Sequence, residues 1–308
     1  MLERCGKILV ALGLSDSDRT TLRYVNALAR LIAPDALDLV HVVDTRTVMW
    51  DLHGERHCFP QDVVSDARAL LHAQVRRGLE PVESATVKTR LLEGAPLYEI
   101  LRLARVEEPD LVITGRNPDK RRSGTLPERL ARKAPCSVLV VPDGVTPRFD
   151  EILVPVDFSA NAAAALSTAV ALGQLAGVEA IRCLHSYWIP RGYAKNERSE
   201  AELGKILRET AEQQWQDFVR PLARRGIDIT CQFRLEKYAS KAIREEVEHE
   251  GIDLVVVGAR GRAVGTSILL GGTTERLVTT TRVPVLTVKE KGSNVSLLDA
   301  LLKALGSA

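Results

Sequence analysis

The feature that most constrains the fold is an internal repeat that spans nearly the whole 308-residue chain. Val10 and Val154 are 144 residues apart, and so are His41 and His185. The offset falls to 143 and then rises to 147 towards the end of each copy, so the first copy has a loop four residues shorter. The length allows two domains, each able to build its own core. The chain therefore predicts two tandem units of one fold.

Within each copy, short apolar runs of strand length alternate with segments whose apolar residues recur at helical spacing. Strands are expected at 7–12, 37–43, 85–91, 110–114 and 137–141, and again at 152–157, 180–185, 228–234, 253–257 and 284–288. Such alternation needs right-handed crossover connections, which place helices on both faces of a parallel sheet. We expect an α/β fold of two tandem, doubly wound, five-stranded parallel sheets.

A loop rich in proline and glycine, Pro142 to Arg148, separates the copies and predicts a domain boundary. We expect domains at 1–146 and 147–290, followed by a short C-terminal helix or tail at 291–308. In a doubly wound sheet, ligands bind beyond the carboxyl ends of the strands where the strand order reverses. That rule places Asp157 and Gly258 side by side.

Composition excludes several classes of protein. Lys and Arg number 42 and Asp and Glu 40, a net charge of +2, which argues against nucleic-acid binding through bulk charge. No apolar run reaches 18 residues and no signal-type segment opens the chain, so we expect no membrane partner and a cytoplasmic location. The five cysteines form no CxxC pair, which argues against a disulfide framework.

One cluster, His53, His57 and Cys58, has spacing that would suit a metal on a helix. Gly54 and Pro60 make that segment a loop, and no third ligand is identifiable, so no metal site is expected.

The stretch from Asp253 to Arg276 resembles a phosphate cradle, because an apolar strand ends at Gly258 and a glycine-rich loop leads into a helix. Glycines let the backbone approach an anion, and free N–H groups at a helix start favour negative charge. Arg260 and Arg262 add positive charge. The alternative is an ordinary strand-to-helix turn, which this local pattern also fits.

Three features together resemble the universal stress protein family. They are the strand Ile152 to Ser159, the Leu184-His185 pair, and a G-x2-G-x9-G signature formed by Gly258, Gly261 and Gly271. The likeness covers nearly the whole chain as two copies. It implies an adenine-nucleotide alpha hydrolase-like fold and, because some members bind ATP, a nucleotide site in the second copy.

The resemblance assigns roles to particular residues of the second copy. Asp157 is expected to contact the nucleoside, and the glycine loop to follow the ribose and the phosphates. The implied binding residues are Pro155, Val156, Asp157, Ser186, Val257, Gly258, Arg260, Gly261, Gly271, Gly272 and Thr273. Members of the family usually have Ser or Thr after the third glycine. Gly272 stands there instead, so one hydroxyl donor is displaced and about 1 kcal/mol of binding is expected to be lost.

The first copy departs further from the family pattern. Gly13 stands where the second copy has Asp157, and Pro118 replaces the second glycine, removing an N–H donor. Gly115 and Gly124 persist. We expect this copy to bind no ATP, while the basic run 120–122 remains a solvated loop.

Several residues have simpler explanations. Asp157 could serve only as a turn or helix cap, although Ser159 suits that role better. His41 and His185 are expected to be packed or bonded to the backbone. No triad, Walker lysine or second carboxylate beside Asp157 is evident, so an enzyme is disfavoured.

The sequence thus predicts a stress-response regulator that binds ATP, with or without Mg²⁺, in its second domain. The first domain is expected to act as an intramolecular dimerisation partner through the last strands, 137–141 and 284–288. A homodimer is left open. The alternatives are a slow ATP hydrolase or nucleotidyl transferase, and a nucleotide-free interaction module. The stress signal, the protein partners and any ligand of the first domain stay open.

Overall fold

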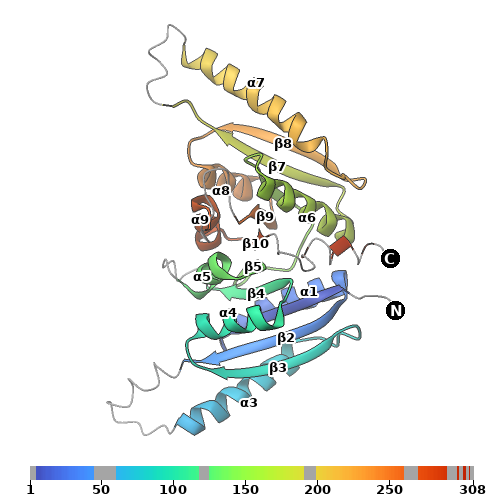
Figure 1. Cartoon of the computed structure of the whole chain (residues 1–308), viewed down its shortest axis with the longest axis vertical. Helices are drawn as coiled ribbons and strands as arrows, with labels where there is room; N and C mark the ends of the chain where they lie inside the picture. Colours follow the sequence, from blue (N-terminus) through green and yellow to red (C-terminus); the bar gives the residue numbers. More distant parts are fainter. Residues whose placement is uncertain are drawn as a thin grey trace.

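The computed structural model describes residues 5–44, 60–117, 125–190, 199–259 and 270–289, together with 297, 301, 302 and 305. These residues form ten strands and eight helices in one elongated molecule (Figure 1). The first half contains β1 (Cys5–Ala11), α1 (Asp18–Ile32), β2 (Pro34–Val43), α3 (Pro60–Gly78), β3 (Thr86–Glu93), α4 (Pro96–Glu107), β4 (Leu111–Arg116), α5 (Leu126–Lys133) and β5 (Ser137–Pro142). The second contains β6 (Ile152–Pro155), α6 (Ala160–Ala176), β7 (Ala180–Tyr187), α7 (Glu200–Val219), β8 (Asp228–Leu235), α8 (Ala239–His249), β9 (Leu254–Gly258), α9 (Gly272–Thr280) and β10 (Val285–Val288).

The strands form a single sheet in the order β3-β2-β1-β4-β5-β10-β9-β6-β7-β8. Within each half, all neighbouring strands are parallel. The expected α/β fold of two doubly wound five-stranded units is confirmed. The halves join through an antiparallel pairing of β10 with β5, in which Val285 lies opposite Val140.

Helices cover both faces of this sheet, and each face carries one continuous core. Leu22 of α1, Leu71 of α3, Leu166 of α6 and Trp215 of α7 belong to one cluster of buried side chains. The other face is covered by α4, α5, α8 and α9, whose buried side chains form a second cluster. Because each cluster contains residues of both halves, the two units share their cores. The domain limits 1–146, 147–290 and 291–308 stay predictions.

The element boundaries follow the sequence closely, with α7 as the largest exception. A helix was expected from 196 to 225, but α7 ends at Val219. Pro221 accounts for the early end, because proline has no N–H to donate to the carbonyl four residues before it. At the other end, Ser199 and Glu202 form a reciprocal capping box.

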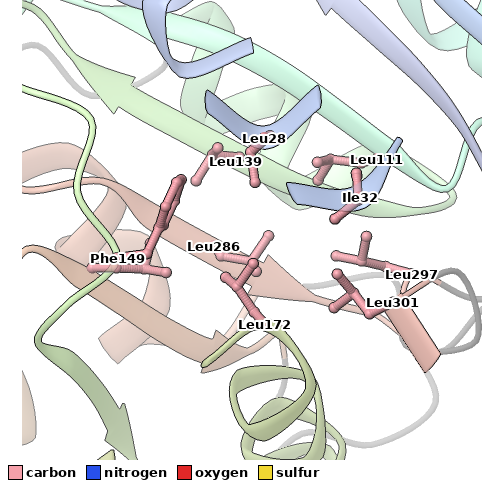
Figure 2. A pocket seen from close by; sticks show the side chains of 10 residues that line it. Leu28, Ile32, Leu111, Leu139, Phe149, Leu172, Leu286, Leu297 and Leu301 are labelled. Atoms are coloured by element: carbon pink, nitrogen blue, oxygen red, sulfur yellow. The ribbon is translucent and has the colours of Figure 1, made fainter. Parts of the chain in front are cut away.

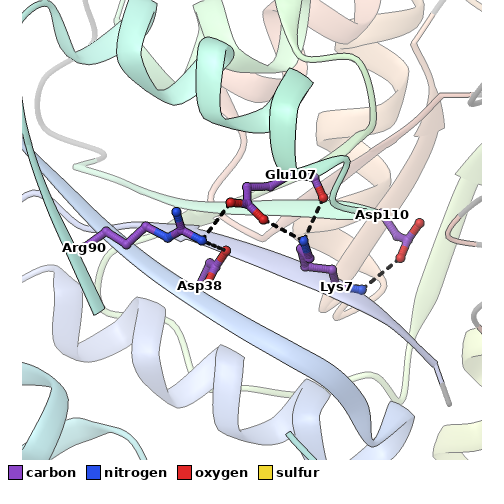
Figure 3. Close-up of polar contacts among 5 residues, drawn as sticks. All are labelled: Lys7, Asp38, Arg90, Glu107 and Asp110. Atoms are coloured by element: carbon purple, nitrogen blue, oxygen red, sulfur yellow. Dashed lines mark hydrogen bonds and ion pairs between the residues drawn. The ribbon is translucent and has the colours of Figure 1, made fainter. Parts of the chain in front are cut away.

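Five charged residues of the first half form a network (Figure 3). Lys7 donates through Nζ to Glu107 Oε2 at 2.7 Å, and Arg90 donates to Glu107 Oε1 at 2.8 Å. Arg90 also pairs with Asp38 at 3.2 Å, and only 2% of that aspartate side chain is exposed. The backbone N–H of Lys7 donates to Asp110 at 2.9 Å. The network joins β1, β2, β3 and α4.

The second half keeps this network with two charges inverted. Arg182 stands where the first half has Asp38, and Glu151 where it has Lys7. Arg182 pairs with Glu250 at 2.5 Å and with Glu151 at 3.4 Å. These three side chains are a third to a half exposed, so their pairing contributes less to stability than the first-half network, in which Asp38 is almost completely buried.

An apolar pocket lies at the seam between the halves (Figure 2). Ten residues line it, none of them polar, including Leu28 of α1, Leu172 of α6 and Leu286 of β10. Leu297 and Leu301, which belong to the expected C-terminal helix, also line it and are buried. These two leucines therefore pack over the seam.

Candidate functional site

The candidate site lies at the carboxyl ends of β6 and β9, where the strand order of the second half reverses. From β6 the chain proceeds outward through β7 to β8, and β9 pairs with β6 on the other side. Asp157 follows β6 by two residues, and Gly258 is the last residue of β9. The apolar pocket at the seam is lined by Leu111 and Leu254, the first residues of β4 and β9, so it lies at the opposite edge.

The loop after β6 is held by local hydrogen bonds. Asp157 Oδ1 accepts the backbone N–H of Ser159 at 3.1 Å, and Ser159 Oγ accepts the N–H of Ala162 at 3.2 Å. Ser159 is thus the N-cap of α6, as expected, while Asp157 is a half-buried carboxylate in the preceding turn. Between them Phe158 has φ +60°, a left-handed conformation that costs about 1 kcal/mol in a residue other than glycine.

Both strand-end histidines support these turns. His185 Nδ1 lies 2.8 Å from the carbonyl oxygen of Val156, and its ring stacks on Phe158 with centroids 4.3 Å apart. His41 makes the corresponding contact with the carbonyl oxygen of Leu12 at 2.9 Å. A carbonyl only accepts, so Nδ1 carries the proton in both. Both histidines are therefore bonded to the backbone, as expected.

Gly258 permits a close approach between β9 and the start of α6. A Cβ atom on Gly258 would lie 2.8 Å from the backbone carbon and oxygen of Asn161. Gly115 has the equivalent place in the first half, where a Cβ would lie 2.6 Å from Thr21 Oγ1. The first glycine of the signature therefore has a packing role in both halves, independent of any role in ligand binding.

The start of α9 provides fewer donors than the sequence indicated. The N–H of Gly271 donates to the carbonyl of Ala259 at 3.0 Å, and the buried Thr274 hydroxyl donates to the carbonyl of Gly258 at 3.0 Å. Gly272 is exposed and has open space where a Cβ would stand. Gly271, the N-cap, has no side chain with which to cap the helix. Gly272 and Thr273 thus remain the candidate amide donors.

The other predicted site residues are distributed along the same edge. Pro155 ends β6 and is half-buried, Val156 is buried, and Ser186 lies near the end of β7. Val257 is buried in β9. Arg260 and Gly261 lie outside the described residues, as do Pro118, Gly124 and the 120–122 run of the first half.

The equivalent loop of the first half is closed by its own carboxyl group. Asp18, at the start of α1, accepts the N–H of Gly13 at 3.0 Å and that of Ser15 at 3.2 Å. Ser15 corresponds to Ser159, so the amide that Asp157 bonds in one half is bonded by Asp18 in the other. Asp18 is only 3% exposed, so its carboxyl group faces the loop. The sequence analysis did not identify it, although alignment of the halves pairs Asp18 with Ala162.

Asp18 makes the stability of the first half depend on pH. Burial is the largest influence and raises the pKa of its carboxyl group above 3.8, while N–H bonds from Gly13, Ser15 and Leu14 act in the opposite direction. The folded chain then holds this proton more tightly than the unfolded chain, so the contribution of Asp18 to stability falls as pH rises through that raised pKa.

In Asp18→Asn this dependence is absent. The stability advantage of the parent protein over the variant should be greatest at and below about pH 4 and decline towards neutral pH. Urea denaturation of both proteins across that range measures the difference. A difference that stays constant or grows with pH contradicts the expected direction.

The described residues reveal neither a metal cluster nor a membrane span. In this part of the chain, no group of three or more His, Cys, Asp or Glu side chains could hold a metal ion. No described helix is long and apolar enough to cross a bilayer. The His53, His57 and Cys58 cluster falls outside the described residues.

The fold and its strand-end edge define a tandem α/β protein of the adenine-nucleotide alpha hydrolase-like class. The sequence model of the universal stress protein family matches residues 5–142 and, a second time, residues 148–289. The chain therefore belongs to the universal stress protein family, as a tandem two-domain member.

Individual relatives agree with this assignment. Universal stress protein MJ0577 of Methanocaldococcus jannaschii is 29% identical over 159 residues, which cover 47% of this chain and 98% of that protein. A universal stress protein of Archaeoglobus fulgidus DSM 4304 has a similar structure, with a TM-score of 0.59 and 19% identity over 94% of this chain and 98% of the other. The functionally unknown protein PA1789 of Pseudomonas aeruginosa PAO1 reaches 0.61 at 17% identity, covering 98% and 97%. These two structures support the fold.

Proposed function

We propose that the chain is a stress-response regulator that binds ATP at the carboxyl ends of β6 and β9, in its C-terminal domain only. The observation that carries the proposal is the position of Asp157, a half-buried carboxylate beside the glycine-ended strand β9. A carboxylate suits the hydroxyl groups of a nucleoside, and open amides at a helix start suit phosphate oxygens. Gly272 and Thr273 supply such amides.

The residues at this edge fit an adenine nucleotide. Pro155, Val156 and Ser186 are placed to frame the base, with Asp157 at the nucleoside. Val257 and Gly258, with Arg260 and Gly261 beyond the described residues, follow the path to the phosphates, where Gly271 to Thr273 begin α9. Mg²⁺, when bound, would be held by the phosphates and water, because no described carboxylate cluster could hold it.

The first half is proposed to bind no nucleotide. Gly13 supplies no carboxylate, and Asp18 occupies the amides of the corresponding loop. Its proposed role is that of a dimerisation partner within the chain. The antiparallel pairing of β5 with β10 and the shared cores support that role. We place the protein in the cytoplasm as part of the same proposal.

Calorimetric titration with ATP and magnesium tests the proposal. We expect one site per chain. Asp157→Ala should weaken binding by about 10- to 150-fold, because a charge-assisted hydrogen bond contributes about 1.5–3 kcal/mol. Gly261→Pro, which copies Pro118 of the first half, should also lose binding. Asp16→Ala removes an exposed aspartate from the equivalent first-half loop and should leave affinity unchanged.

Three outcomes would count against the proposal. Absence of binding to the parent protein would favour the nucleotide-free interaction module. Two sites per chain would show that Asp18 does not close the first half. Steady ATP turnover that disappears in Asp157→Ala would instead favour the hydrolase or transferase alternative.

A further inference from the structure

The first half of the chain contacts the C-terminal end of α9, the helix whose start carries Gly272 and Thr273. Arg116, the last residue of β4, is buried with 6% of its surface exposed. It donates through one terminal nitrogen to the carbonyl of Thr279 at 2.9 Å and through the other to the carbonyl of Thr281. The last carbonyls of a helix have no partner within it and carry partial negative charge. Arg116 therefore satisfies two of them and adds a matching positive charge.

A second arginine of the first half contacts the opposite end of the same helix. Arg132 of α5 pairs with Glu275, in the first turn of α9, at 2.5 Å. It also pairs with Glu128 of its own helix at 3.3 Å. Glu128 and Glu275 occupy the same repeat position, and Arg132 lies between them, with α5 and α9 side by side (Figure 1). The repeat counterpart of Arg132 is Thr279, so only the first half supplies an arginine between α5 and α9 at this position.

The contacts that the first half makes to α9 differ from those that the second half makes to α5. The repeat counterpart of Arg116 is Ala259, which cannot make the same bonds. The end of α5 is instead contacted by Lys289, whose Nζ donates to the carbonyl of Ala134 at 2.8 Å. A planar guanidinium bridges two carbonyls in a fixed geometry, whereas an ammonium is a point charge on a flexible chain. The more rigid contact therefore acts on α9.

The length of α9 makes these contacts important for its start. It has nine residues, and helices shorter than about 12 residues are marginal in water without tertiary contacts. A short helix moves as one rod, so a displacement at Thr279 also displaces the N–H groups of Gly272 and Thr273. Phosphate recognition depends on the position of those groups.

We propose that Arg116 and Arg132 are positioning residues that hold α9 in its ligand-binding orientation, so that the first half sets the nucleotide affinity of the second. The inference rests on the proposed function, because it assigns a structural cause to the affinity of that same site. This inference gives the first half a specific role, because Arg116 at the end of β4 contacts α9 of the second half.

The test uses the full-length chain and two readouts. Calorimetry with ATP and magnesium measures affinity, and hydrogen exchange of the 272–280 amides in nucleotide-free protein measures the order of α9. The variants are Arg116→Ala, Arg116→Lys and Arg132→Ala. Arg208→Ala is the matched control, because it removes an arginine–glutamate pair of 2.8 Å on the exposed face of α7.

Arg116→Ala should weaken ATP binding by about 10- to 30-fold, because only part of the energy lost with these two hydrogen bonds is transmitted along α9 to the ligand-binding end. It should also speed exchange in α9 by at least about 10-fold. The ATP affinity and the exchange rate of Arg116→Lys should lie between those of Arg116→Ala and the parent protein. Arg132→Ala should weaken binding by about threefold at low salt and less at high salt, because its ion pairs are partly exposed. Arg208→Ala should change neither readout.

Parent-like affinity and exchange in folded Arg116→Ala would overturn the inference while leaving the proposed function intact. If Arg116→Ala does not fold, the same result in Arg116→Lys together with Arg132→Ala would overturn it. If the parent protein binds no ATP, the proposed function fails first and the inference fails with it. Faster exchange in α9 with unchanged affinity would also overturn it, because the helix order would then not control binding.

Discussion

Gly258→Ala is expected to destabilise the C-terminal half by about 2–3 kcal/mol, the cost of forcing extra volume into a packed interior. The new methyl carbon would lie 2.8 Å from the backbone of Asn161, and backbone atoms cannot rotate away as a side chain can. Either α6 or β9 must shift. Both carry the candidate site, so ATP affinity should fall as well. Urea denaturation followed by circular dichroism measures the stability.

The same substitution at two other glycines provides controls. Gly272→Ala should leave stability unchanged or raise it by up to about 1 kcal/mol, because space is open there and alanine favours a helix. Gly115→Ala should cost less than Gly258→Ala, since its nearest contact is a side-chain atom, Thr21 Oγ1, and not the backbone. Equal effects at Gly258 and Gly272 would mean that the close approach of β9 and α6 is not what requires glycine.

Arg90→Ala is expected to cost about 3 kcal/mol, the lower end of the range for removing one partner from a buried ion pair, because Asp38 is buried but 29% of the Arg90 side chain is exposed. The loss leaves Asp38, almost completely buried, without its cation, and removes one of the two cations at Glu107 (Figure 3). The hydrogen bond from Lys7 is the main cause that lowers the pKa of Glu107 below its usual 4.5. A lowered pKa adds stability at neutral pH that is lost as pH falls through and below that value. Urea denaturation at neutral and acidic pH measures both effects.

Arg182→Ala is the matched control, because Arg182 belongs to the corresponding network of the second half. Its pairs with Glu151 and Glu250 are partly exposed, so removal should cost no more than about 1 kcal/mol. A cost at Arg182 as large as that at Arg90 would contradict the assignment of the effect to the burial of Asp38.

The fold could be predicted from the sequence because its evidence is local and occurs twice. Most strands are apolar runs, the edge strands β3 and β8 mix polar and apolar residues, and each helix has its own periodicity. The repeat checks one half against the other. The boundaries that differ have local causes of their own, such as Pro221 after α7. The family could also be recognised, because its signature glycines, Gly258, Gly261 and Gly271, follow one strand in a short stretch of sequence.

The functional details depended on information that a linear pattern does not contain. Arg116 and Thr279 are 163 residues apart, and no periodicity connects them. Gly258 was predicted as a ligand contact, and its packing against Asn161 could not be separated from that role, because both require the absence of a Cβ. Asp18 was within reach, since the carboxylate missing at Gly13 reappears five residues later in the aligned halves.

The order of the ten strands also determines with whom the chain can associate. β5 lies between β4 and β10, and β10 between β9 and β5, so neither has an unpaired edge. Single-domain members of such a family that pair through this edge could exchange subunits with one another. Here the fusion keeps each half with the same neighbour for the lifetime of the molecule. Among the described strands, only the outer ones, β3 and β8, have an edge at which a further copy could extend the sheet.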